Sequence, residues 1–201
     1  MSDRSRPSAM PVADAPQSTA QQRRASLEAL FRPRSVAVIG ATDRSGTVGR
    51  SVVSNLLESN FPIKVYAVNP SHNEALGIKT HKRIGEIEGG VDLAIVVTPA
   101  QTVPQIIGDC VDAGVRSAVV ISAGFREQGR EGALLEKEIL KHLRRESSHG
   151  SPAGTLRLIG PNCMGFMNPT IERNATCAKS IPQKGSVAWL SQSGALQTAI
   201  L

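Results

Sequence analysis

The sequence predicts an α/β protein with a doubly wound, mostly parallel sheet, an arrangement of the Rossmann-like kind. Short runs of Val, Ile and Leu alternate with segments of helical periodicity between residues 35 and 159, which is typical of right-handed βαβ crossovers. Hydrophobic residues make up 40% of the 201-residue chain, but aromatic residues only 3%. The core must therefore consist mainly of aliphatic side chains, which buried parallel strands prefer.

Each predicted strand is an apolar, β-branched run that stops at a turn residue. Strands are expected at residues 35–40, 63–68, 91–97, 116–122 and 156–159. Apolar residues that share one face predict helices at 48–59, 102–113 and 132–145, and a short amphipathic helix at 26–31. Ligands of such sheets bind outside the carboxyl ends of the strands, so the segments that directly follow the strands are the candidate site.

Four segments are expected along the chain. Residues 1–24 have no periodicity and are rich in Ser, Ala, Pro, Gln and Arg, which predicts a disordered tail before a Rossmann-like domain at 25–160. Residues 161–182 contain three prolines and are expected to be an irregular linker. A strand at 186–190, a turn and a helix from Ala195 then predict that residues 183–201 are the start of a second, flavodoxin-like α/β domain, truncated here.

Charge and cysteine usage exclude several classes of protein. The net charge is +6, and much of the excess comes from six arginines within residues 1–34. A solvated tail explains them best, with a targeting peptide or an anion-binding arm as alternatives, and no helix-turn-helix pattern indicates a nucleic-acid partner. The three cysteines form no C-x-x-C or Cys/His cluster, so no metal site is expected. The same cysteine usage argues against a disulfide scaffold and predicts a cytoplasmic protein. No secretory signal is recognised, and no apolar run approaches the roughly 20 residues of a membrane span.

A glycine-rich loop at residues 40–49 follows the first strand and predicts phosphate binding. The Lys of a P-loop is missing after Gly46, which disfavours that type of ATP or GTP site. NAD-binding proteins carry an acidic residue after the second strand, whereas Asn69 and Pro70 stand there. The missing carboxylate favours a ribose with an additional phosphate, as in NADP and coenzyme A (CoA), and Arg44 and Lys64 are candidates to bind it.

Seven short motifs then follow one another over about residues 28–201. They are Val-Ala-Val-Ile-Gly-Ala, Gly-Thr-Val-Gly, Ala-Val-Asn-Pro, Asp-Leu-Ala-Ile-Val-Val-Thr-Pro-Ala, Ile-Ser-Ala-Gly-Phe-Arg-Glu, Ile-Gly-Pro-Asn-Cys-Met-Gly and Ser-Gln-Ser-Gly-Ala-Leu. In this order they resemble the superfamily of ADP-forming acetyl-CoA synthetases and succinyl-CoA synthetase α-subunits.

The resemblance implies a CoA-binding domain at the front of an acid–CoA ligase, which interconverts acyl-CoA, ADP and phosphate with acid, CoA and ATP. In this superfamily a phosphohistidine carries the phosphoryl group. It would lie beyond residue 201, so no catalytic residue is expected in this chain. The implied cofactors are CoA or acetyl-CoA here, and ATP or ADP with Mg²⁺ in the full enzyme. The implied partners are a small carboxylic acid, an ATP-grasp subunit or domain, and further copies in an oligomer.

The resemblance also implies the site residues. Those along the CoA phosphates are Gly40, Thr42, Asp43, Arg44 and Ser45. Those on the adenosine side are Asn69 and Pro70, and those that flank the cofactor further along are Pro99, Ile121, Ser122 and Ala123. Those that would hold the phosphohistidine are Ser191, Gln192, Ser193 and Gly194, for which a simple capping turn is the alternative.

The chain departs from the superfamily where other members have a lysine shortly after the second strand, because His72 and Asn73 occupy that region. Cys163 has apolar neighbours and no adjacent His, which predicts a packed small residue and not a nucleophile. Two other functions stay open: a CoA-binding regulatory domain of a protein lysine acetyltransferase, and an NAD(H)-binding redox sensor.

Overall fold

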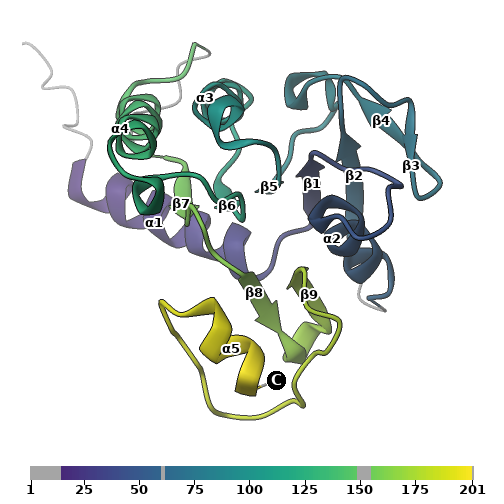
Figure 1. The fold of residues 1–201 in the computed structure, drawn as a ribbon. Helices are drawn as coiled ribbons and strands as arrows, with labels where there is room; N and C mark the ends of the chain where they lie inside the picture. Colours follow the sequence, from purple (N-terminus) through teal and green to yellow (C-terminus); the bar gives the residue numbers. More distant parts are fainter. Residues whose placement is uncertain (1–14, 60–61, 149–154, 201) are drawn as a thin grey trace, which may run out of the picture.

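The computed structural model describes residues 15–59, 62–148 and 155–200. Seven strands form one sheet in the order β3-β4-β2-β1-β5-β6-β7 (Figure 1). Five of them are parallel to their neighbours, namely β1 Ser35–Ile39, β2 Lys64–Val68, β5 Leu93–Val96, β6 Ser117–Val120 and β7 Arg157–Ile159. The predicted doubly wound, mostly parallel sheet is therefore confirmed.

Helices cover both faces of the sheet. The α-helices are α1 Ala15–Phe31, α2 Val48–Leu57, α3 Val103–Asp112, α4 Arg130–Arg144 and α5 Gly194–Ile200. Short 3₁₀ turns are η1 Ile84–Glu86, η2 Ala100–Thr102, η3 Arg126–Gln128 and η4 Pro169–Ile171. One hydrophobic cluster joins the sheet to α3 and α4, and a second joins it to α1, α2 and the strand β9 described below.

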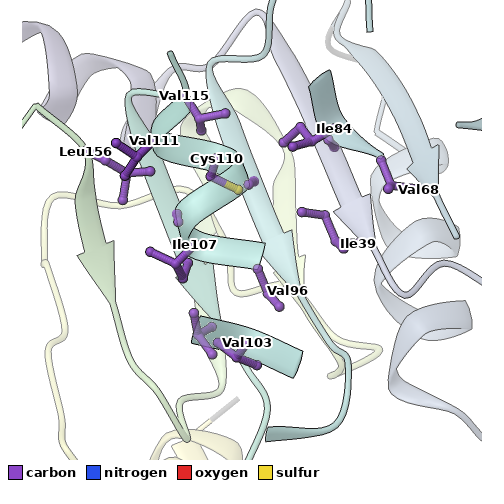
Figure 2. Packing of buried hydrophobic residues seen from close by; sticks show 14 of the residues in the cluster. Ile39, Val68, Ile84, Val96, Val103, Ile107, Cys110, Val111, Val115 and Leu156 are labelled. Carbon is purple, nitrogen blue, oxygen red and sulfur yellow. The ribbon is translucent and has the colours of Figure 1, made fainter. Parts of the chain in front are cut away.

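The central strand β1 shows why the sheet strands are continuous apolar runs. Ala37 and Ile39 belong to the cluster on the α3 face, whereas Val36 and Val38 belong to the cluster on the α2 face. Successive side chains of a strand point to opposite faces, and both faces are covered, so every position is apolar. Figure 2 shows the α3 face, where the buried Cys110 packs near the sheet.

The order of the strands changes direction at β1, which pairs with β2 on one side and β5 on the other. At such a switch point the loops that leave the two neighbouring strands diverge to opposite faces and leave a crevice. In this chain the crevice lies at the carboxyl ends of β1, β2 and β5.

Two hairpins were not expected from the sequence. β3 (Glu74–Ala75) and β4 (Ile78–His81) form an antiparallel pair at the sheet edge, and β4 pairs in parallel with β2. β8 (Gly165–Asn168) and β9 (Arg173–Thr176) form a second antiparallel pair within the segment predicted to be an irregular linker. All four residues of β9 are buried, and β9 packs beside α2. The prediction of an irregular linker at 161–182 is thus wrong for the residues of this hairpin.

Two predictions near the chain ends also differ from the structure. Helix α1 begins at Ala15, so residues 15–24 are helical, although they were predicted to be disordered; residues 1–14 lie outside the described residues. No strand forms at 186–190, where Val187 is 88% and Leu190 97% exposed. A strand needs the backbone hydrogen bonds of a neighbouring strand, and in the described part of the chain no strand pairs with these residues. Helix α5 follows near the predicted position, while the assignment of 183–201 to a second domain stays a prediction.

Candidate functional site

A pocket of about 1130 Å³ opens at the carboxyl ends of β1, β2 and β5. Its walls come from these strand ends, from the first turn of α2, from α3 and the turn before it, and from the segment after β4. The lining residues are Ile39, Gly40, Thr42, Arg44, Thr47, Val48, Gly49, Val68, Asn69, Pro70, His72, Lys82, Arg83, Ile84, Val97, Thr98, Pro99, Thr102, Gln105, Ile106 and Asp109.

The glycine-rich loop brings the start of α2 against the end of β1. Gly40 has a φ of +99°, a conformation that favours glycine, and a Cβ on Gly49 would collide with the carbonyl oxygen of Gly40. Thr47 caps α2, because its Oγ1 accepts from Arg50 N at 3.3 Å. The same Oγ1 donates to Arg44 O at 2.7 Å and thereby closes the loop. The helix start therefore lies at the pocket wall, where its free N–H groups and dipole favour an anion.

Asn69, at the end of β2, connects the loops around the pocket through hydrogen bonds of its side-chain amide. Its Nδ2 donates to Ala41 O at 2.8 Å, and its Oδ1 accepts from Ser71 N at 2.9 Å. Both ends of the amide are therefore used within the protein. Asn69 shapes the pocket wall, and the adjacent Pro70 also lines the pocket.

Lys82 is a site residue that the sequence reasoning missed. It directly follows β4, and its Nζ donates to Pro70 O at 3.0 Å, to His72 O at 3.3 Å and to Asn73 Oδ1 at 3.2 Å. The ammonium group thus lies at the end of β2, where the superfamily pattern would place a lysine from the loop itself. The sequence carried no signal for this placement, because β4 was not expected.

The charged residues that line the pocket are mainly cations. They are Arg44, Lys82 and Arg83, whereas Asp109 is the one carboxylate among the lining residues, and its Oδ1 accepts from Gln105 Nε2 at 2.8 Å. Lys64, a candidate for the additional ribose phosphate, is the first residue of β2. It therefore lies at the amino end of that strand, away from the pocket, and this assignment is wrong.

Six of the residues implied by the resemblance line the pocket: Gly40, Thr42, Arg44, Asn69, Pro70 and Pro99. Asp43 and Ser45 do not. The Oδ1 atom of Asp43 accepts from Leu76 N in the β3–β4 turn, and its carbonyl oxygen accepts from Arg50 Nη1 at 2.7 Å. Asp43 therefore joins the glycine-rich loop to the hairpin and to α2, while Ser45 is exposed in the loop.

The segment after β6 lies outside the pocket lining as well. Ile121 packs against the α2-side cluster, and Ser122 Oγ donates to Val96 O at 3.4 Å. Beyond Ala123, Glu127 Oε1 accepts from Gly124 N at 2.6 Å and from Phe125 N at 3.1 Å. These backbone donors hold the pKa of the Glu127 carboxyl below its usual range. Glu127, which the sequence reasoning did not single out, thus fixes the Ala-Gly-Phe turn.

The turn before α5 is a helix cap in this structure. Leu196 N donates to Ser193 Oγ at 3.2 Å, and Ser193 N donates to Ser191 Oγ at 3.0 Å. No residue from Ser191 to Gly194, Gln192 included, lines the pocket. Their expected role with a phosphohistidine stays a prediction from the resemblance.

Among the described residues, the structure shows neither an activated thiol at Cys163 nor a cluster of metal ligands. Cys163 Sγ donates to Val120 O at 3.2 Å, and burial raises the pKa of this thiol, as befits a packed small residue. Within residues 15–59, 62–148 and 155–200, no His, Cys, Asp or Glu cluster could hold a metal ion. In the same ranges no helix is both long and apolar enough to span a membrane.

Several of the proteins similar to this chain are named as CoA ligases. An ADP-forming acetate–CoA ligase I of Archaeoglobus fulgidus is 45% identical over 175 residues, which are 87% of this chain and 24% of that protein. The α subunit of an ADP-forming acetate–CoA ligase II of Pyrococcus furiosus is 43% identical, over 87% of this chain and 36% of the subunit. The chain therefore spans only a quarter to about a third of the length of these relatives.

Two solved structures match the fold over most of the chain. A crystal structure from Pyrococcus horikoshii OT3 has a TM-score of 0.78 and 40% identity, and covers 87% of this chain and 38% of its own. The acetyl-coenzyme A synthetase 1 of Ca. Korarchaeum cryptofilum, in complex with phosphate and ADP, has a TM-score of 0.76 and 36% identity, over 87% of this chain and 35% of its own. The family model described as CoA binding domain matches residues 34–169, and the chain therefore belongs to the family of CoA-binding domains.

Proposed function

We propose that this chain is the CoA-binding portion of an ADP-forming acyl-CoA synthetase. The pocket carries this proposal, because it joins the start of α2 to three cations at the switch point of the sheet. CoA is a polyanion with a diphosphate and a ribose phosphate, so such a site is electrostatically complementary to it. The similarity to named acetate–CoA ligases supports the choice of enzyme class.

Each part of the pocket has a role in this proposal. Gly40, Thr42 and the start of α2 would hold the diphosphate, with Arg44 adding positive charge. Pro70 and the apolar side chain of Ile84 would pack against the adenosine end, and Pro99 would flank the cofactor further along. CoA itself would supply the thiol that carries the acyl group, while the residues described here bind and orient the cofactor.

The complete enzyme would interconvert acyl-CoA, ADP and phosphate with acid, CoA and ATP. We place the phosphohistidine, the ATP-grasp part and the Mg²⁺ that accompanies the nucleotide outside residues 1–201, and we expect a cytoplasmic oligomer. Ser191, Gln192, Ser193 and Gly194 would contact the phosphohistidine segment. This chain alone would then bind CoA without catalysing turnover.

Isothermal titration of the purified chain with CoA, and with NAD as the comparison, tests the proposal. CoA should bind, NAD should bind at least about tenfold more weakly, and no ATP should form from acetyl-CoA, ADP and phosphate. Binding of NAD without CoA would instead support the redox sensor. The names of the similar proteins favour a ligase over a lysine acetyltransferase, and acetylation of a protein lysine by the full-length protein would reverse that preference.

A further inference from the structure

We infer that Lys82 is the residue that selects ligands with a phosphomonoester on the adenosine ribose. The inference rests on the proposed function for its pocket and for CoA as the first ligand to test. It assigns ligand selectivity to the segment after β4, outside the strand–loop segments to which the sequence motifs point.

The position of the ammonium group is the first argument. In Rossmann-like sheets the adenosine ribose binds at the carboxyl end of the second strand. An acidic residue there accepts hydrogen bonds from unmodified ribose hydroxyls, whereas a cation there binds a phosphate on the ribose. In this chain the end of β2 carries Asn69, whose amide is engaged with Ala41 and Ser71. The nearby Lys82 Nζ, 3.0 Å from Pro70 O, therefore supplies the charge at this point.

The contacts of Lys82 show that this charge is held in place and not neutralised. Its three partners are neutral oxygens, and among the described residues no carboxylate forms an ion pair with it. The carboxylate of Glu86 accepts from the backbone N–H of Lys82 at 2.8 Å. A phosphate oxygen would replace the longest contact of Nζ, the 3.3 Å bond to His72 O, with a stronger charge-assisted bond.

Arg44 is a pocket cation with a different expected role, and an exposed lysine outside the pocket serves as the control. Arg44 lies in the glycine-rich loop beside the start of α2, where the diphosphate is expected, so it should act on every adenosine diphosphate ligand alike. Lys79 lies on β4 itself, is exposed and does not line the pocket, which makes it a matched control for the charge of this strand.

The test compares two ligand pairs that differ only in the ribose phosphate: CoA with dephospho-CoA, and NADP with NAD. Isothermal titration is made with the wild type, Lys82→Met, Lys82→Gln and Lys79→Met. In both Lys82 variants the affinity for CoA should fall about 10- to 100-fold, while the affinity for dephospho-CoA changes less than about threefold. Lys79→Met should keep the wild-type ratio. Lys82→Gln retains an amide donor for the loop, so it separates loss of charge from loss of loop bracing.

The outcomes distinguish this inference from the proposed function. If both Lys82 variants keep the wild-type ratio of CoA to dephospho-CoA affinity, or weaken both ligands equally, Lys82 only braces the loop and the inference is wrong. If the wild type prefers NADP to CoA and Lys82→Met removes the preference of NADP over NAD, the proposed function fails while the selectivity of Lys82 stands. If the wild type binds neither CoA nor NADP, both are wrong.

Discussion

Replacing Gly49 by Ala tests whether the close approach of α2 to β1 builds the phosphate site. A Cβ at this position would collide with the carbonyl oxygen of Gly40, which is backbone and cannot rotate away. Helix α2 would have to move outward, although Val52, Val53 and Leu56 on its inner face are at most 1% exposed. Overpacking of this kind costs about 2 kcal/mol. For a chain of this size that corresponds to a fall in Tm of about 4–8 °C.

The same substitution should weaken CoA binding by about tenfold or more, because it displaces the backbone N–H groups at the pocket wall. Thermal unfolding followed by circular dichroism gives the stability, and isothermal titration gives the Kd. The matched control is Gly85→Ala, since no atom lies within 4 Å of a Cβ added there and Gly85 is outside the pocket lining. The control should stay within about 0.5 kcal/mol of the wild type.

An unchanged Kd for CoA in a folded Gly49→Ala protein would refute the reasoning, because the loop would then tolerate a shifted helix. A fall in Tm without a change in Kd would leave Gly49 with a packing role alone. A fall in Tm of similar size in Gly85→Ala would show that any methyl group added to a glycine in this region is destabilising. The clash with Gly40 would then not explain the effect of Gly49→Ala.

Three further predictions concern packing and protonation. The Asp112 carboxylate accepts from both Nη atoms of Arg145 at 2.8 Å, and this pairing holds its pKa well below the usual value. Because the Asp112 side chain is 33% exposed, Asp112→Asn should lower the free energy of unfolding at pH 7, measured in urea, by only about 1 kcal/mol. The folded pKa is the lower one, so this difference should be present above about pH 4 and shrink as the pH falls further. Asn55→Ala should lower the free energy of unfolding by about 1–2 kcal/mol, since Asn55 Nδ2 donates at 2.8 Å to the carbonyl oxygens of Thr176 and Ala178. Replacement of the exposed Lys79 by Ala should leave the midpoint of urea unfolding nearly unchanged. Ellman's reagent should modify the exposed Cys177 quickly and Cys163 slowly, because burial raises the pKa of the Cys163 thiol; equal rates would contradict that assignment.

The buried parallel strands could be predicted because their signal is local. Each is an apolar run, and both faces of the sheet demand apolar residues. Strand β9, Arg173–Thr176, carries no such signal, since its polar side chains are buried with hydrogen bonds that the fold supplies. Arg173 Nη1, for example, donates to Pro33 O, 140 residues away in sequence. The opposite error occurred at 186–190, where an apolar run has no neighbouring strand among the described residues and stays exposed. The apolar composition of a segment predicts its burial, but whether it pairs as a strand depends on residues that are distant in sequence.

In the candidate site, too, some features follow from a local sequence motif and others depend on contacts between segments that are distant in sequence. The glycine-rich loop and the strand ends are readable because each lies within one strand–loop–helix unit. The position of the Lys82 charge depends on two hydrogen bonds that the glycine-rich loop makes to neighbouring segments. Asp43 of the loop accepts from Leu76 in the β3–β4 turn, and Asn69 binds the loop at Ala41. The first bond fastens the hairpin to the glycine-rich loop and the second fastens the end of β2 to it, so the segment that carries Lys82 is positioned relative to the helix start before any ligand binds. Such preorganisation lowers the cost of binding a polyanion, and it explains how a cation from a different strand can stand where a family pattern places one in the loop.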